Sequence, residues 1–75
     1  MTDRIRWGIL GTGSIAKKFA EGLAVLPDAD LVAVGSRARE TARAFADRYG
    51  APRAHGTYRG LAEDPEVDAV YVATP

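Results

Sequence analysis

The stretch IRWGILGTGSIAKKFAEGL, residues 5–23, decides the fold because its hydrophobic period changes in the middle. Apolar residues first alternate with others and then run together, which predicts a short, largely buried strand over residues 5–10. From Ser14 the apolar residues recur with the 3.6-residue period of a helix, predicted to extend to Leu26. Two glycines lie between these segments, where a strand turns into a helix.

The rest of the chain repeats this alternation. The continuous apolar run over residues 31–34 is typical of a strand covered on both faces, as in parallel sheets. The further expected elements are a helix over residues 38–49 ended by a left-handed Gly50, a brief strand over 53–55, helical turns over 58–63 and another buried strand over 69–73. The order β-α-β-α-β-(α)-β predicts an α/β fold with a Rossmann-type parallel sheet, the first half of a doubly wound dinucleotide-binding domain.

Composition excludes several classes of function. The 75 residues carry 10 basic and 10 acidic side chains, so nucleic acid and anionic membranes are poor partners. There is no cysteine and a single histidine, His55, which argues against a metal centre; we interpret it as a surface or edge histidine. Asp64, Glu66 and Asp68 are interpreted as a solvated turn. No apolar segment approaches the roughly twenty residues of a membrane span, and we expect a cytoplasmic domain.

The glycines fit a phosphate-binding turn. Gly11 would let the chain turn sharply, Gly13 would leave room for a pyrophosphate, and Ala16 would allow close packing of helix and strand. The backbone N–H groups that follow the strand would then face an anion at the positive end of the helix. The candidate pyrophosphate-binding residues are Gly11, Thr12, Gly13, Ser14, Ile15 and Ala16. A purely structural turn is the alternative, since many strand-to-helix turns contain glycine for packing alone.

The end of the second strand bears on the choice of cofactor. NAD-binding domains place a carboxylate there for the ribose hydroxyls, whereas this chain has Ser36 and Arg37 and no acid before Glu40. A hydroxyl and a guanidinium can both bind a 2′-phosphate, so NADP is favoured, with NAD as the alternative. Arg37 could also be an ordinary solvated residue at a helix start.

Four segments together resemble a known family. WGILGTGSIAKKFAEGL, LPDADLVAVGSR, FADRYG and DPEVDAVYVATP are similar, in order and spacing, to the N-terminal part of the Gfo/Idh/MocA oxidoreductases. This is the family of glucose–fructose oxidoreductase and inositol dehydrogenase. The first of these segments and the pair Ser36 and Arg37 look most like the NADP-using, dihydrodiol dehydrogenase-like branch of this family. The resemblance covers nearly all of the chain.

The resemblance implies hydride transfer between a nicotinamide dinucleotide and a sugar, polyol or diol-type substrate. It also implies that Ala73, Thr74 and Pro75 lie beside the cofactor, at the carboxyl end of the last strand. Members of the family continue into a larger substrate domain, which often forms the interface of a homo-oligomer. Residues 1–75 are therefore expected to be the N-terminal part of a dinucleotide-binding domain.

The sequence also departs from the family pattern. It lacks the Glu-Lys-Pro motif that supplies the catalytic lysine, and Lys17 and Lys18 on the first helix cannot take that role. No catalytic residue is therefore assigned, and this segment is expected to be inactive alone. A nucleotide-binding module without catalysis, or an isolated half-domain, is the alternative function.

Overall fold

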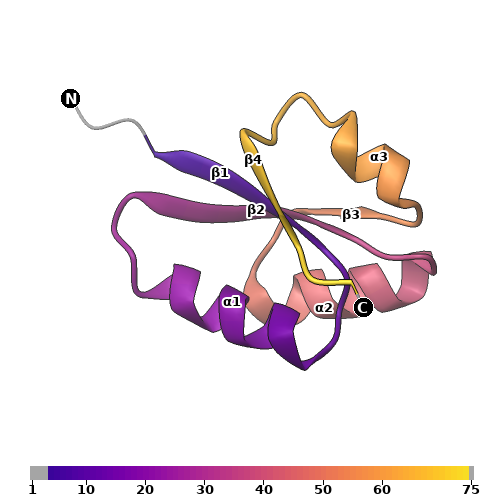
Figure 1. The fold of residues 1–75 in the computed structure, drawn as a ribbon, viewed down its shortest axis with the longest axis horizontal. Helices are drawn as coiled ribbons and strands as arrows, with labels where there is room; N and C mark the ends of the chain where they lie inside the picture. The colour runs from indigo at the N-terminus through magenta and orange to yellow at the C-terminus, as the bar shows by residue number, and fades with distance from the viewer. Residues whose placement is uncertain (1–3, 75) are drawn as a thin grey trace.

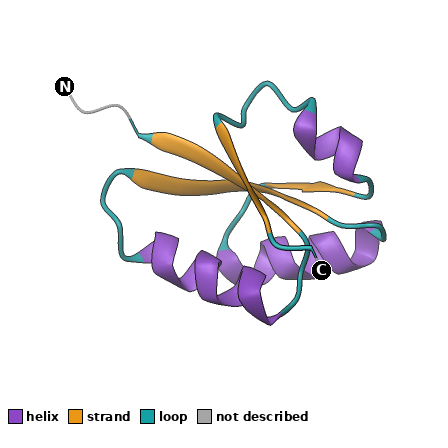
Figure 2. Ribbon diagram, in the orientation of Figure 1, coloured by secondary structure: helices purple, strands orange, loops and turns teal. Residues whose placement is uncertain are grey.

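The computed structural model describes residues 4–74, in which strands and helices alternate as expected (Figure 2). The elements are β1 (Ile5–Leu10), α1 (Ser14–Ala24), β2 (Ala29–Gly35), α2 (Arg39–Tyr49), β3 (Arg53–His55), α3 (Tyr58–Ala62) and β4 (Ala69–Val72). The predicted element order is confirmed. Helix α1 ends two residues earlier than predicted, and Val25 and Leu26 form an exposed turn before Pro27.

The four strands form one parallel sheet in the order β3-β2-β1-β4. The chain moves outward from β1 through β2 to β3 and then returns to place β4 on the other side of β1. Helices α1 and α2 cover one face of the sheet, and α3 lies on the opposite face (Figure 1). This is the predicted Rossmann-type architecture, in which the carboxyl ends of all strands share one edge.

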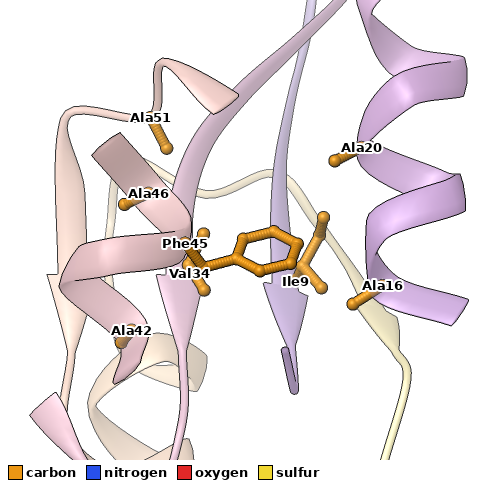
Figure 3. Close-up of a cluster of buried hydrophobic side chains, with 8 residues drawn as sticks. All are labelled: Ile9, Ala16, Ala20, Val34, Ala42, Phe45, Ala46 and Ala51. Atoms are coloured by element: carbon orange, nitrogen blue, oxygen red, sulfur yellow. The ribbon is translucent and has the colours of Figure 1, made fainter. Parts of the chain in front are cut away.

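The main core lies between the sheet and the pair α1 and α2. Figure 3 shows the ring of Phe45 pointing from α2 toward Ile9 of β1, across Val34 of β2. The other five members of this core cluster are all alanines, whose small side chains let the helices approach the sheet closely. The core residues are Ile9, Ala16, Ala20, Val34, Ala42, Phe45, Ala46 and Ala51.

Two glycines allow α3 to pack on the second face of the sheet. Leu61 of α3 is fully buried there. A Cβ on Gly35 would lie 2.9 Å from Cβ of Leu61, and one on Gly8 would lie 3.0 Å from its Cδ1. A side chain on Gly35 would therefore push α3 away from β2, whereas one on Gly8 would require the side chain of Leu61 to shift by a few tenths of an ångström.

Strand β4 differs from the expected buried strand. Tyr71 is half-buried and stacks on Phe19 of α1, with 3.9 Å between ring centroids, but Val70 and Val72 on the other face are 37% and 62% exposed. The reason is the position of β4 at the sheet edge, because α3 lies over β1, β2 and β3 instead. Trp7 of β1 is half-buried and meets the other edge of this aromatic pair, since its ring contacts Phe19 edge-on.

Among residues 4–74 no helix is long and apolar enough to cross a membrane. The longest helices, α1 and α2, have 11 residues each.

Candidate dinucleotide-binding site

A hollow of about 410 Å³ lies at the carboxyl edge of the sheet, where β1, β2 and β4 end. Its lining residues are Gly11, Thr12, Gly13, Ser14, Ile15, Ser36, Arg37, Tyr58, Ala73 and Thr74. The structure thus brings together nearly all the residues selected from the sequence. Ala16 lies beneath the hollow, fully buried in the core, and Pro75 lies outside the described residues. Tyr58 also lines the hollow, although the sequence motifs did not select it.

Gly11 is a glycine that the fold itself requires. Its φ of +107° lies in a region that side chains disfavour, and a Cβ there would lie 3.0 Å from the carbonyl oxygen of Ala73. Hydrogen bonds hold the chain on both sides, since the N–H of Gly11 donates to Gly35 and that of Ala73 donates to Leu10. The first glycine of the motif is therefore explained by the turn and its neighbouring strands.

Gly13 has no such structural reason to be a glycine. Its backbone is extended, with φ −79° and ψ −168°, and a Cβ on it would meet no atom within 4 Å. Gly13 also occupies the N-cap of α1, where serine, threonine, asparagine or aspartate would stabilise the helix better. The absence of a side chain leaves the backbone bare beside the hollow.

The N-terminus of α1 carries a partial positive charge that its own first residues do not neutralise. The first N–H groups of a helix have no partner within it, and Gly13 supplies no capping side chain. The first turn of α1 also contains no acidic residue. The N–H groups of this turn can therefore bind an anion in the hollow.

Ser36 and Arg37 follow β2 at the other side of the hollow. Ser36 is buried; its N–H donates to the carbonyl of His55, and its Oγ accepts from the N–H of Ala38 at 3.3 Å. Its hydroxyl hydrogen remains able to donate to a ligand. Arg37 is exposed, and it takes part in none of the ion pairs found within residues 4–74.

The interpretation of Asp64 as part of a solvated turn is wrong. Its side chain is fully buried and its Oδ2 accepts hydrogen bonds from Arg53 Nε at 2.6 Å and from His55 Nε2 at 2.7 Å. The N–H of Glu66 donates to Oδ1 at 2.9 Å. His55 is consequently a partner of this carboxylate rather than a lone edge histidine. The Asp64 cluster, formed by Arg53, His55 and Asp64, ties the chain after α3 to β3.

The Asp64 cluster predicts a loss of stability in acid. Burial acts to raise the pKa of Asp64, but the hydrogen bonds from Arg53, Glu66 and His55 outweigh it and lower that pKa from 3.8 to about 2. The ionised carboxylate therefore contributes about 2 kcal/mol of stability above pH 4, which is lost as the pH falls from about 4 to about 2. Denaturant unfolding across this window should show a steeper decline for the native protein than for Asp64→Asn. Parallel curves would contradict the expectation.

The two lysines of α1, which the sequence analysis excluded as catalytic residues, do not enter the hollow. Lys17 and Lys18 are exposed on α1, outside its lining. Within the described part of the chain, no group of three histidine, aspartate or glutamate side chains is placed to hold a metal ion.

The fold and the hollow together define a Rossmann-type α/β domain with a glycine turn at the head of its first helix. Residues 5–75 match the family model GFO_IDH_MocA, described as an oxidoreductase family with an NAD-binding Rossmann fold, and the chain belongs to that family. It is thus an NAD(P)-binding domain of an oxidoreductase family, as the resemblance implied.

Individual relatives agree with this assignment. Trans-1,2-dihydrobenzene-1,2-diol dehydrogenase of Danio rerio is 46% identical over 72 residues, covering 93% of this chain and 22% of that protein. KijD10, a 3-ketoreductase from Actinomadura kijaniata in complex with NADP, superposes with a TM-score of 0.88 at 35% identity, covering 97% of this chain and 23% of that chain. GenD2 from gentamicin A biosynthesis, in complex with NAD, gives a TM-score of 0.86 at 33% identity, covering 100% of this chain and 21% of that chain.

Proposed function

We propose that this chain binds NADP(H) in the hollow at the carboxyl edge of its sheet and orients it for hydride transfer. The observation that carries the proposal is Gly13, a glycine that neither backbone strain nor packing requires, beside the open start of α1. A pyrophosphate that must approach the backbone closely explains why this position has no side chain.

Each part of the hollow has a proposed role toward the cofactor. The turn from Gly11 to Ile15 holds the pyrophosphate through its N–H groups, while buried Ala16 keeps α1 close to the sheet. Ser36 and Arg37 bind the 2′-phosphate, and Ala73 and Thr74, with Pro75 after them, border the remainder of the dinucleotide. The nicotinamide supplies the hydride acceptor or donor when it is bound; this chain supplies binding and orientation.

We further propose a sugar, polyol or diol-type substrate. The relatives include a dihydrodiol dehydrogenase and a 3-ketoreductase, both of which act at carbons bearing a hydroxyl or carbonyl group. This chain spans about a fifth of the length of these relatives, so we assign the substrate site to a further domain and the catalytic lysine to a Glu-Lys-Pro motif outside residues 1–75. A homo-oligomer and a cytoplasmic location stay predictions.

The proposal predicts that Gly13→Asp abolishes cofactor binding without unfolding the protein. Aspartate is a good N-cap residue and its Cβ meets open space, so the stability should be unchanged or slightly higher. Its carboxylate would occupy the place of the pyrophosphate and repel it. Calorimetric titration with NADPH should show the dissociation constant rising at least about 100-fold, or about 2.8 kcal/mol.

Gly22→Asp is the matched control. Gly22 lies in the helix that Gly13 caps, is also exposed and likewise has no atom within 4 Å of its Cβ, but it does not line the hollow. The added charge is about 13 Å farther along the helix, beyond the screening length of roughly 8 Å at physiological salt. NADPH affinity should therefore stay within about threefold of the native value. Unchanged binding by a folded Gly13→Asp protein would overturn the proposed function.

A further inference from the structure

Tyr58 lines the hollow, yet the proposed function gives it no role. It is the first residue of α3 and is partly buried. Leu61 lies three residues later, on the same face of this short helix, and presses against Gly35 at the end of β2. Tyr58 therefore lies one turn farther toward the carboxyl edge, above the point where β2 leads into Ser36 and Arg37.

The loop that leads into Tyr58 also places this residue on the side of the hollow next to Ser36 and Arg37. Gly56 precedes it by two residues, and a Cβ on Gly56 would lie 3.0 Å from Cβ of Arg39. The loop between β3 and α3 is thus packed against the first residue of α2. Ser36 and Arg37 lead into the same helix start. Tyr58 consequently enters the hollow beside the two residues that we assign to the 2′-phosphate.

Both ends of α3 are fixed, so this position is well defined. At the beginning, Thr57 caps the helix, since its Oγ1 accepts a hydrogen bond from the N–H of Gly60 at 2.9 Å. At the end, the Asp64 cluster binds the chain to β3. Leu61 anchors the middle against the sheet. An aromatic side chain held in this way can form a rigid wall at little entropic cost on binding.

We propose that Tyr58 contacts the adenosine half of the dinucleotide through its aromatic ring, an inference that rests on the proposed function. The adenosine half offers a flat purine and a ribose, and a purine face stacks well on an aromatic ring. Ser36 and Arg37 bind the phosphate of the same half. Tyr58 is a cofactor-binding residue that sets affinity for adenosine phosphates; the Asp64 cluster positions it.

The test compares Tyr58→Leu and Tyr58→Phe by calorimetric titration with NADPH and with 2′,5′-ADP, which contains only the adenosine half and its phosphates. Tyr58→Leu should raise both dissociation constants about tenfold, the effect of losing one base–aromatic contact. Tyr58→Phe keeps the ring and should stay within about threefold. Tyr49→Leu is the control, because Tyr49 lies at the end of α2 outside the hollow.

The outcomes separate the two proposals. Unchanged affinities in Tyr58→Leu would overturn the role of Tyr58, as would a loss with NADPH that is absent with 2′,5′-ADP. Equal losses in Tyr58→Leu and Tyr49→Leu would show a general effect of destabilisation and would also overturn it. Failure of the native protein to bind NADPH would instead overturn the proposed function, and the role of Tyr58 with it.

Discussion

Replacing Asp64 by alanine is expected to lower the free energy of unfolding by about 3 kcal/mol. The native carboxylate is fully buried and accepts hydrogen bonds from Arg53, His55 and the N–H of Glu66. Alanine would leave these three donors without their acceptor and a small cavity in its place. Arg53 is 44% exposed and can turn to water, which limits the loss.

Denaturant unfolding of two further variants would test whether the burial of the Asp64 carboxylate is responsible for this loss of stability. Asp64→Asn keeps the shape of the side chain and some of its hydrogen bonds, so it should lose clearly less stability than Asp64→Ala. Asp68→Ala removes a partly exposed carboxylate that pairs with Arg6, and such pairs contribute about 1 kcal/mol or less. Equal losses in Asp64→Ala and Asp68→Ala would contradict the importance assigned to burial.

The double variant Ser36→Asp, Arg37→Ala is expected to weaken NADPH binding about 100-fold while leaving NADH within about threefold. A charge-assisted contact from Arg37 to a 2′-phosphate is worth about 1.5–3 kcal/mol, or a factor of about 10 to 150. The new carboxylate would repel that phosphate but could accept hydrogen bonds from the ribose hydroxyls of NADH. Aspartate can also replace the Ser36 hydroxyl as acceptor for the N–H of Ala38.

Parallel titrations with NADPH and NADH would measure this preference. Arg48→Ala is the matched control, since Arg48 is an exposed arginine in the last turn of α2 whose guanidinium lies over the ring of Tyr49. It should leave both affinities unchanged. Equal weakening of NADPH and NADH in the double variant would contradict the proposed preference for NADP.

Much of the fold was predictable because local patterns carry it. Neighbouring residues alone indicate where the hydrophobic period changes, at Gly11 and Gly13. They also indicate that α2 ends in a left-handed residue, Gly50, whose φ is +80°. The lining of the hollow was also largely predictable, since parallel strands bring their carboxyl ends to one edge. Residues as distant as Thr12 and Thr74 meet there for that reason.

The predictions that proved wrong concern residues whose burial depends on contacts with parts of the chain far away in sequence. Asp64 stands in a stretch rich in acidic residues, and only the packing of α3 against β3 encloses it with Arg53 and His55. Conversely, the apolar run of β4 suggested burial on both faces, but α3 lies over the other strands and leaves Val70 and Val72 exposed. The spacing from Tyr58 to Leu61 was the one signal that could have placed Tyr58 over the sheet edge.

The glycines of this domain differ in what surrounds them, and the difference has an evolutionary consequence. Gly8 and Gly35 both pack against Leu61, and a side chain at Gly35 in particular would displace α3 from the sheet. Gly13 has open space around it and Arg37 is exposed, so changes there would alter the proposed cofactor site without disturbing the packing beneath. Mutation can therefore explore new cofactor preferences at the rim while the scaffold stays constant. A protein engineer seeking to exchange one dinucleotide for another has the same freedom at the same few positions.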